Sequence, residues 1–394
     1  MQPFRVKVLN RIVAEGVAVL TGMSVGTEVD DPHGILVRSA KVDTADYPSL
    51  LAVARAGAGV NNITVDKATE QGVCVFNTPG ANANAVAELV FTMLGLAARN
   101  LHRAVDFCRG LSGLDDQEIS RQVEGKKAAF RGTELAGKTM GVIGLGKIGV
   151  LVANGGIQRR MRVVGYDPFP ALENIHALSP NVCLARAVDD VLQQSQILSL
   201  HIPLTPKTRG FVDAELLGRL PPGAILVNYA RGPVVDEAAV LAGLESGQLG
   251  RYITDFPTSG LLQHPAVLTS PHLGASTEES EEQCACLAAR ALRDYLEYGT
   301  IAHSVNFPTA ESIPAKNVHT RLIMINRDVP GMIGLASQTL GAAGINIASY
   351  LNESNGSIGY NLIDLEEALP EAVLARIAAH DGVLRTRSLV FHRA

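Results

Sequence analysis

Residues Thr139 to Gly149 read TMGVIGLGKIG. The apolar run that ends at Ile143 predicts a buried strand, and the glycines after it form the pattern GxGxxG where a helix should begin. In this pattern one glycine allows a tight turn, one lets a pyrophosphate approach the backbone, and one permits close packing of helix on strand. The stretch therefore predicts a dinucleotide fingerprint whose phosphates lie at the N-terminus of the helix. Its glycines are Gly144, Gly146 and Gly149.

The residues that follow supply the expected context for this fingerprint. A second apolar strand, MRVVGYD, ends in Asp167, about twenty residues on, where the pattern places an acid. Its carboxylate would accept hydrogen bonds from a ribose hydroxyl and repel a 2′-phosphate, and neither Pro168 nor Phe169 could receive that phosphate. NAD is therefore favoured over NADP. Because Gly155 and Gly156 are poor helix formers, we expect the intervening helix to be short or irregular.

Length and composition describe an ordinary globular protein. At 394 residues, with 47% hydrophobic and 19% charged residues, the chain has room for two or three domains. A net charge of −5 gives no reason to expect nucleic acid or a membrane surface as a partner. There is no apolar run of spanning length and no signal-peptide core, so a cytoplasmic location is expected. The five cysteines lack zinc-ligand spacing, so neither a metal site nor a disulfide framework is expected.

Three regions follow one another along the chain. The first, up to about Gly80, alternates short strands with helical stretches and predicts a parallel βα unit. The fingerprint region continues this alternation, after a polar stretch between Arg103 and Arg131 that we interpret as a surface excursion. The last region has the order βαββαβ, with Asn355–Gly356 as its hairpin turn. We expect an α/β protein with two Rossmann-like or flavodoxin-like doubly wound parallel sheets and a C-terminal βαββαβ domain of ferredoxin-like type.

Two residues of the fingerprint region are the best candidates for substrate binding and proton transfer. Arg231 follows the strand AILVN, so it should lie at the carboxyl edge of the sheet, where a planar guanidinium could grip a substrate carboxylate. His272 follows another strand end, in SPHLGAS, and an imidazole titrates near neutral pH. It could pass a proton to or from an oxygen while hydride moves at the neighbouring carbon.

The order of the motifs VIGLGKIG, YDP, HIPLTPKTRG, NYARG and PHLGASTEE resembles that of the D-isomer-specific 2-hydroxyacid dehydrogenases. ARAGAGVNNI and FNTPGANANAVAEL extend the resemblance to nearly the whole chain. It implies a discontinuous substrate-binding domain of residues 1–88 and 277–303 and an NAD-binding domain of residues 89–276. It further implies a linker of residues 304–317 and a regulatory ACT domain of residues 318–394.

The resemblance also assigns residues to roles. Arg231 and His272 match the catalytic arginine and histidine of the family. Cofactor contacts beyond the fingerprint glycines are implied for Lys147, Ile148, Asp167, Tyr229, Ala230 and Asp255. Substrate contacts are implied for Arg38, Ser39, Arg55, Ala56, Gly57, Asn77 and Thr78. An effector, in this family often L-serine, would be held by Asn326, Asp328 and Asn346.

One departure from the family stands in the string DFPTSG. The family places a glutamate a few residues after the aspartate, whereas this chain has Ser259 or, with another gap, Gly260. A carboxylate there orients the imidazole and stabilises its protonated form. We therefore expect a slower enzyme whose reduction rate falls early as the pH rises. Introducing glutamate at position 259 should restore the rate.

The expected activity is NAD-dependent oxidation of 3-phospho-D-glycerate to 3-phosphohydroxypyruvate. An alternative within enzymes is another D-2-hydroxy acid, such as glycerate or 2-hydroxyglutarate. An alternative from another class is a sensor that binds NAD and an amino acid and has lost turnover with its glutamate. The resemblance implies a homodimer or homotetramer, paired through the nucleotide domain and the C-terminal domain.

Overall fold

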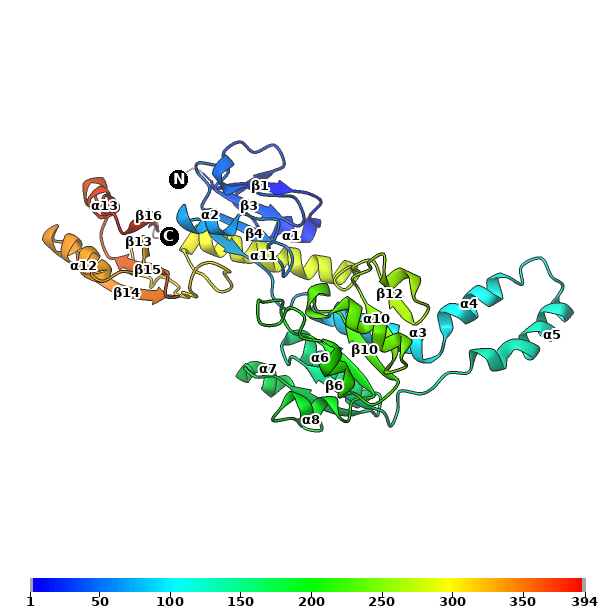
Figure 1. The fold of residues 1–394 in the computed structure, drawn as a ribbon. Helices are drawn as coiled ribbons and strands as arrows, with labels where there is room; N and C mark the ends of the chain where they lie inside the picture. The colour runs from blue at the N-terminus through cyan, green and yellow to red at the C-terminus, as the bar shows by residue number, and fades with distance from the viewer. Residues whose placement is uncertain (1–2, 392–394) are drawn as a thin grey trace. The chain divides into compact units, whose positions relative to one another are not determined.

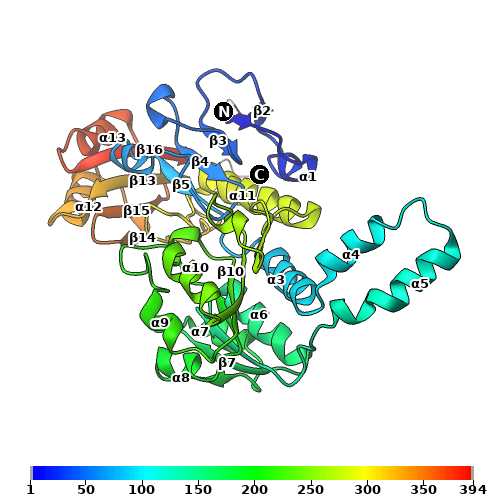
Figure 2. The same ribbon diagram turned by 45° about the vertical axis from the view of Figure 1, so that its right-hand side comes forward.

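The structure, a computed structural model, describes residues 3–391. It divides into two compact units, one formed by the chain up to Asn82 together with the chain from Glu278 onward, the other by Ala83–Thr277. Figures 1 and 2 show the parallel sheet of each unit and, at the end of the first, the smaller C-terminal sheet. Within residues 3–391 no helix has the length and apolar character that a membrane span requires.

The first unit contains a five-stranded parallel sheet with the order β2-β1-β3-β4-β5. This is the flavodoxin-like order: β2 is added on one side of β1, and β3 and the later strands are added on the other side. Its strands are β1 (Arg5–Leu9), β2 (Ser24–Gly26), β3 (Gly34–Val37), β4 (Ala52–Arg55) and β5 (Cys74–Phe76). Its helices are α1 (Ala14–Ala18), α2 (Val65–Glu70) and α11 (Glu278–Tyr298), with a short 3₁₀ turn η1 (Thr44–Asp46). Strand β3 is buried throughout, as a central parallel strand covered on both faces must be.

The second unit contains a seven-stranded sheet with the order β12-β11-β10-β9-β6-β7-β8, all pairs being parallel. Six of these strands have the classic Rossmann order. The strands are β6 (Thr139–Ile143), β7 (Arg162–Tyr166), β8 (Cys183–Leu184), β9 (Ile197–Leu200), β10 (Ala224–Asn228), β11 (Leu249–Thr254) and β12 (Val267–Thr269). The helices are α3 (Ala83–Ala98), α4 (Leu101–Arg109), α5 (Asp116–Lys126), α6 (Lys147–Gln158), α7 (Leu172–Ala177), α8 (Val188–Leu192), α9 (Ala214–Gly218) and α10 (Glu237–Glu245). Short 3₁₀ turns occupy Lys127–Phe130, Gly232–Val234 and Leu261–Gln263.

Helix α6 is neither short nor irregular, so that expectation from its two glycines was wrong. It runs unbroken for 12 residues. A Cβ at Gly155 would lie 2.4 Å from a ring carbon of Phe91 on α3, and one at Gly156 would lie 2.7 Å from a methyl of Val163 on β7. The glycines therefore let the helix approach its neighbours, and this packing outweighs their low helix propensity.

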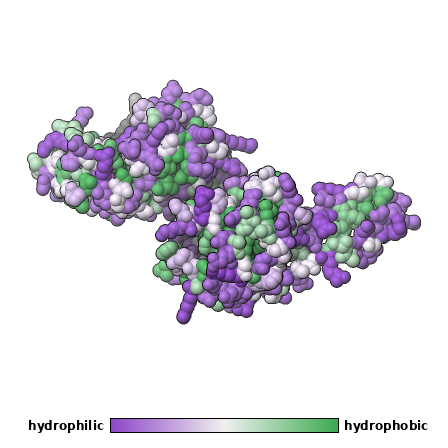
Figure 3. Space-filling model, viewed as in Figure 1, coloured by the Kyte–Doolittle hydropathy of each residue, from purple (hydrophilic) through white to green (hydrophobic). Residues whose placement is uncertain are grey.

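The polar stretch expected to be a surface excursion forms two helices, α4 and α5, neither of which contains a buried residue. They form an arm that leaves the body of the second unit after α3, and hydrophobic side chains gather on it (Figures 1 and 3). Leu101, Val105 and Leu114 are among the exposed large apolar residues of the described chain. Without a covering partner these side chains remain in contact with water.

The C-terminal region forms an antiparallel sheet of order β14-β15-β13-β16. Its elements are β13 (Thr320–Arg327), α12 (Met332–Ala342), β14 (Ile347–Ser354), β15 (Ile358–Leu365), α13 (Glu371–Ala378) and β16 (Val383–Val390). This is the βαββαβ arrangement expected from the sequence. Strand β15 is buried along its whole length, whereas the edge strand β14 is mostly exposed.

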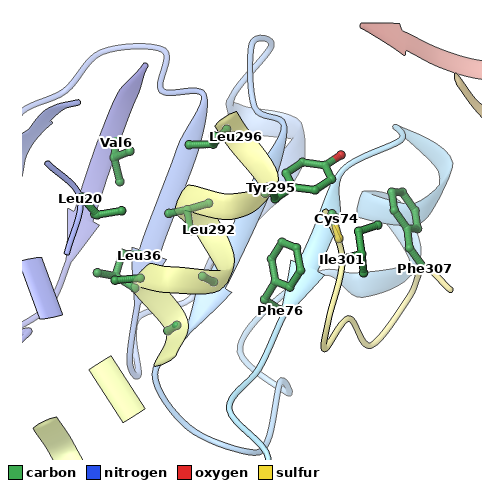
Figure 4. Packing of buried hydrophobic residues seen from close by; sticks show 14 of the residues in the cluster. Val6, Leu20, Leu36, Cys74, Phe76, Leu292, Tyr295, Leu296, Ile301 and Phe307 are labelled. Carbon is green, nitrogen blue, oxygen red and sulfur yellow. The ribbon is translucent and has the colours of Figure 1, made fainter. Parts of the chain in front are cut away.

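The C-terminal sheet shares a hydrophobic core with the first unit. Tyr360 and Ile323 of the sheet belong to the same buried cluster as Phe76 of β5 and Tyr295 of α11. Figure 4 shows Phe76 beside Tyr295, with Cys74 and Ile301 between them and Phe307. The C-terminal sheet is therefore part of the first unit.

Residues 304–317, expected to be a linker, are fastened to this core in their first half. Asn306 is buried and its side chain bonds to one backbone edge of β5, accepting from Val75 N at 2.9 Å and donating at 2.9 Å to the O of Val73, the residue just before the strand. Phe307 and Ala310 are buried as well. The Asn306 side chain thus makes the hydrogen bonds that a neighbouring strand would make, and these bonds hold residues 304–310 against β5.

Candidate active site

The fingerprint loop has the open form that a dinucleotide requires. Gly144 has φ +92°, and a Cβ there would lie 2.6 Å from His201 O; a Cβ at Gly149 would lie 1.8 Å from Gly144 O. At Gly146, by contrast, nothing lies within 4 Å, so the backbone of this residue is open to an approaching pyrophosphate. Gly146 is the N-cap of α6, whose first residues are Lys147 and Ile148. The loop and the positive end of the helix therefore fit NAD.

Asp167 lies directly beyond β7 and is tied to the fingerprint. Its Oδ2 accepts from Leu145 N at 2.8 Å and its Oδ1 accepts from Phe169 N at 2.8 Å. Each carboxylate oxygen keeps further acceptor capacity, so these bonds fix the side chain without preventing a contact to ribose hydroxyls. Lys147 forms an ion pair at 2.9 Å with Glu173, which lies on α7 beyond this acid.

We expect the variant Asp167→Ser to bind NADH roughly 10- to 100-fold more weakly, since hydrogen bonds to a charged group contribute about 1.5–3 kcal/mol. Its discrimination against NADPH should also decrease, because the negative charge that repels the 2′-phosphate is gone. Titrations of NADH and NADPH by fluorescence measure both effects. Asp189→Ser, an exposed change in the same unit, serves as the control. Unchanged NADH affinity in Asp167→Ser would remove this residue from the cofactor site.

Arg231 is positioned by the end of β10. Asn228, fully buried, accepts from Ala230 N at 3.1 Å and donates to Arg231 O at 3.0 Å, which fixes the turn NYAR. Tyr229 and Ala230 are buried within this turn, whereas Arg231 is exposed. Its Nη1 donates to Ala230 O at 2.7 Å. The turn thus presents the guanidinium at the carboxyl edge of the sheet.

His272 lies in a loop held by Asp255. The carboxylate of Asp255 accepts from Ser270 Oγ at 2.6 Å, Leu273 N at 2.8 Å and Gly274 N at 2.7 Å. The backbone of His272 has φ +56°, a left-handed conformation that costs free energy in a residue other than glycine. Since Asp255 is buried and bonds on both sides of His272, it stabilises this conformation. Asp255 was expected as a cofactor contact, and the structure shows that its carboxylate holds this loop.

Another histidine lies near the fingerprint and is unsuited to proton transfer. His201 follows β9, and its Nε2 lies 2.8 Å from Ser199 Oγ. Burial lowers the pKa of His201 to about 3, so the ring stays neutral across the physiological range. His272, in contrast, is exposed, with its ring edge-on to Phe256 at a centroid distance of 5.2 Å.

The residues expected to bind substrate gather at the carboxyl ends of β3, β4 and β5. Arg55 Nε donates to Arg38 O at 3.0 Å, and Thr78 N donates to Gly57 O at 3.1 Å. Asn77 Nδ2 donates to Ala58 O at 2.7 Å, close in sequence to the buried Ala56. The hydroxyl of the buried Thr78 has no hydrogen-bond partner within residues 3–391. These loops therefore form one connected group, in which the donor and acceptor of the buried Thr78 hydroxyl are not used by any described residue.

The guanidinium of Arg38 is already paired. Its Nη2 lies 2.7 Å from Glu281 Oε1 on the first turns of α11. Ser39 is held differently, because its N–H donates to Asn10 Oδ1 at 3.1 Å. Glu281 and Asn10 were not expected to be near this group. Local sequence patterns could not predict these contacts, because Glu281 and Asn10 are far from the β3 loop in sequence. Folding brings α11 and the end of β1 beside that loop.

The residues expected to hold an effector are not equally available. Asn326 is buried, accepts from Asn361 Nδ2 at 2.7 Å, and donates to Arg327 O at 2.7 Å. Asp328 accepts from Ser354 Oγ at 2.6 Å. Asn346 is exposed, just before β14. Asn361 on β15 was not predicted from the sequence. Its side-chain amide bonds to those of Asn326 on β13 and Asn352 on β14.

Comparisons with known proteins show the family to which this chain belongs. A family model described as D-isomer specific 2-hydroxyacid dehydrogenase, NAD binding domain, matches residues 101–274. The D-3-phosphoglycerate dehydrogenase of Haemophilus influenzae is 32% identical over 385 residues, covering 94% of this chain and 90% of the relative. The enzyme of the same name from Escherichia coli is 32% identical over 378 residues, covering 92% and 88% of the two chains. The chain therefore belongs to the D-isomer specific 2-hydroxyacid dehydrogenases and uses NAD.

A solved structure of an enzyme with a similar fold adds to these comparisons. The NAD⁺-bound 3-phosphoglycerate dehydrogenase of Entamoeba histolytica superposes with a TM-score of 0.61 at 28% identity, covering 77% of this chain and 99% of that one. These two relatives in sequence are D-3-phosphoglycerate dehydrogenases, and an NAD⁺-bound structure of an enzyme of that kind shares the fold. This chain is an NAD-dependent dehydrogenase acting on a small hydroxy acid.

Proposed function

We propose that this protein oxidises 3-phospho-D-glycerate to 3-phosphohydroxypyruvate with NAD as the oxidant, the first step of L-serine synthesis. The observation that carries the proposal is the full-length similarity to the Haemophilus influenzae enzyme, which extends over 94% of this chain. The presence of two arginines, Arg38 and Arg55, on the connected loops of the first unit supports a substrate that carries a phosphate.

In this proposal the acid–base group is His272. Its neutral imidazole accepts the proton of the substrate hydroxyl during oxidation, and the imidazolium returns it during reduction. NAD, held at the fingerprint loop of α6, would serve when bound as the acceptor or donor of the hydride. Arg231 holds the substrate carboxylate through its planar fork, and the positive charge also stabilises negative charge that develops on the carbonyl oxygen. Asp255 keeps the His272 loop in its left-handed conformation throughout.

The phosphate would be received by Arg38 and Arg55. Because Arg38 is paired with Glu281, a phosphate dianion must share this guanidinium with a carboxylate. The five donors of an arginine allow such sharing. We therefore expect the phosphate to add less affinity than it would at an arginine without an acidic partner.

We expect NADH-dependent reduction of 3-phosphohydroxypyruvate, measured at 340 nm from pH 6 to 9, to exceed reduction of hydroxypyruvate about tenfold or more in kcat/KM, since charge-assisted hydrogen bonds to a phosphate contribute about 1.5–3 kcal/mol. Arg55→Met should remove this preference while leaving hydroxypyruvate reduction nearly unchanged. Equal rates with both substrates would favour another D-2-hydroxy acid, and glycerate and 2-hydroxyglutarate are the first to test. Tight NADH binding without turnover on any 2-oxo acid would favour a sensor.

We also propose that the C-terminal sheet binds an amino-acid effector at Asn326, Asp328 and Asn346, and that the protein forms a homodimer or homotetramer. The exposed apolar residues of the α4–α5 arm support pairing through the second unit. Repeating the reduction assay with added L-serine tests the effector, and sedimentation tests the assembly.

A further inference from the structure

The second unit has a pocket of about 440 Å³ beside the candidate catalytic arginine. Its wall includes Arg231, Glu237, Tyr252, Phe256 and Pro257. Phe256 contributes to the pocket and also packs edge-on against the ring of His272. The pocket is therefore lined by Arg231, and the Phe256 ring, which contacts His272, forms part of its wall.

Glu237 is the carboxylate of this pocket. It is the first residue of α10 and is half-buried. A Cβ built on Gly260 would lie 2.6 Å from Glu237 Oε1, so the carboxylate occupies the space into which a side chain at position 260 would extend. Within residues 3–391 the carboxylate has neither a hydrogen bond nor an ion pair of 4 Å or less. Its charge does reach the pocket, because it assists burial in raising the pKa of Tyr252.

The other carboxylate near His272 is already committed. Asp255 accepts from three donors, with one bond to Oδ1 from Ser270 Oγ, one to Oδ1 from Leu273 N and one to Oδ2 from Gly274 N. This carboxylate is buried and maintains the loop. Of the two acids, only Glu237 has its acceptor capacity available to the pocket.

We propose that Glu237 is a positioning residue of this site, whose carboxylate stabilises the positive charge on Arg231 and on the protonated imidazole of His272. The inference rests on the proposed function, because it assigns the acid–base role to His272. A negative charge near an imidazole favours the protonated form, and the cation of Arg231 opposes it. The negative charge of Asp255 favours the protonated imidazole, as that of Glu237 does. Tyr252 is neutral in the physiological range and contributes no charge. The chain thus keeps a carboxylate at the site although its DFPTSG loop carries none.

The test is the pH dependence of Glu237→Gln. Removing the negative charge makes the protonated imidazole less favourable, so the reduction rate, which needs that form, should fall at a lower pH. We expect the midpoint of the pH profile to decrease by about half a pH unit or more, as charge interactions across a partly buried site typically produce. NADH affinity should stay unchanged. Glu245→Gln, with the same loss of charge at the exposed far end of α10, should leave the midpoint where it is.

Glu237 could also act only by stabilising α10, because an acid at a helix N-terminus is favourable. Restoring the pH profile with a carboxylate elsewhere distinguishes the two roles. In the background of Glu237→Gln, the change Ser259→Glu places a carboxylate on the adjacent loop and should return the midpoint toward that of the unmodified protein. Melting temperatures of both variants check that they remain folded. An unchanged midpoint in Glu237→Gln, or a failure of Ser259→Glu to shift it back, would overturn the proposal.

A binding readout separates this inference from the proposed function. Oxamate, a 2-oxo acid analogue that cannot be reduced, should bind to the NADH-loaded protein only when His272 is protonated, and NADH fluorescence reports the binding. The midpoint of oxamate binding should shift in Glu237→Gln as the rate does. If the protein turns over no phosphorylated substrate but shows this shift, the proposed substrate is wrong and the inference stands. If oxamate binds with the same midpoint in both proteins, the inference is wrong whatever the substrate.

Discussion

The variant His272→Asn is expected to reduce the 2-oxo acid about 100- to 10,000-fold more slowly than the unmodified protein, the range that general acid–base groups typically contribute. Its KM for NADH should change little, because the fingerprint and Asp167 are intact. Asparagine is the appropriate replacement, since after glycine it is among the residues that best tolerate the left-handed backbone found at this position. Steady-state rates at several pH values measure the effect.

A matched control is His176→Asn on α7, which removes an exposed histidine from the same unit. It should retain full activity. Comparable rates for His272→Asn and the unmodified protein would show that the proton comes from another group or from water. His201 would not be that group, since its burial keeps it neutral.

The second large effect is on stability. Arg321→Met is expected to lower the free energy of unfolding of the first unit by about 3–5 kcal/mol, the usual result of leaving one member of a buried ion pair alone. Arg321 on β13 is fully buried and bonds to Asp364 on β15, with Nε–Oδ1 at 2.6 Å and Nη2–Oδ2 at 2.8 Å. Its remaining donors bond to Tyr298 O, Ser312 O and Ser312 Oγ. The substitution leaves these acceptors and a buried carboxylate without their donors.

The chain has no tryptophan, so urea unfolding is best followed by far-ultraviolet circular dichroism, with hydrogen exchange to separate the two units. The double variant Arg321→Met with Asp364→Leu should recover most of the loss, because replacing both charges by apolar groups is often neutral. Arg293→Met, which breaks the half-exposed pair with Asp294, should cost under about 1 kcal/mol. A loss below about 1 kcal/mol for Arg321→Met would contradict this account.

The end of α11 explains why the C-terminal sheet is part of the first unit. The last carbonyls of a helix lack intrahelical partners. Here Arg387 Nη2 donates to Tyr295 O at 2.6 Å, and Arg321 Nη1 donates to Tyr298 O at 2.9 Å. The guanidinium of Arg387 also lies over the Tyr295 ring at 4.8 Å. Arginines of the C-terminal sheet thus satisfy the negative end of a 21-residue helix whose first turns carry Glu281, the partner of Arg38.

The sequence by itself determined the fold class and the main features of the second unit. The period of its apolar residues and the GxGxxG spacing are local signals, so β6, α6 and β7 could be placed from the sequence alone. Arg231 and His272 were predicted as site residues for a related reason. Each follows a strand directly, and the carboxyl ends of parallel strands must meet at one edge of the sheet.

Only the tertiary structure decided which partners these residues have. Glu237 faces Gly260, Asp255 bonds across the His272 loop, and Arg38 pairs with Glu281 more than 200 positions away. It also decided that Gly155 and Gly156 serve close packing and that Asn306 fastens the segment before the C-terminal sheet to β5. Such contacts depend on how separate elements pack against one another, and neither spacing nor propensity within a short stretch of sequence encodes that packing.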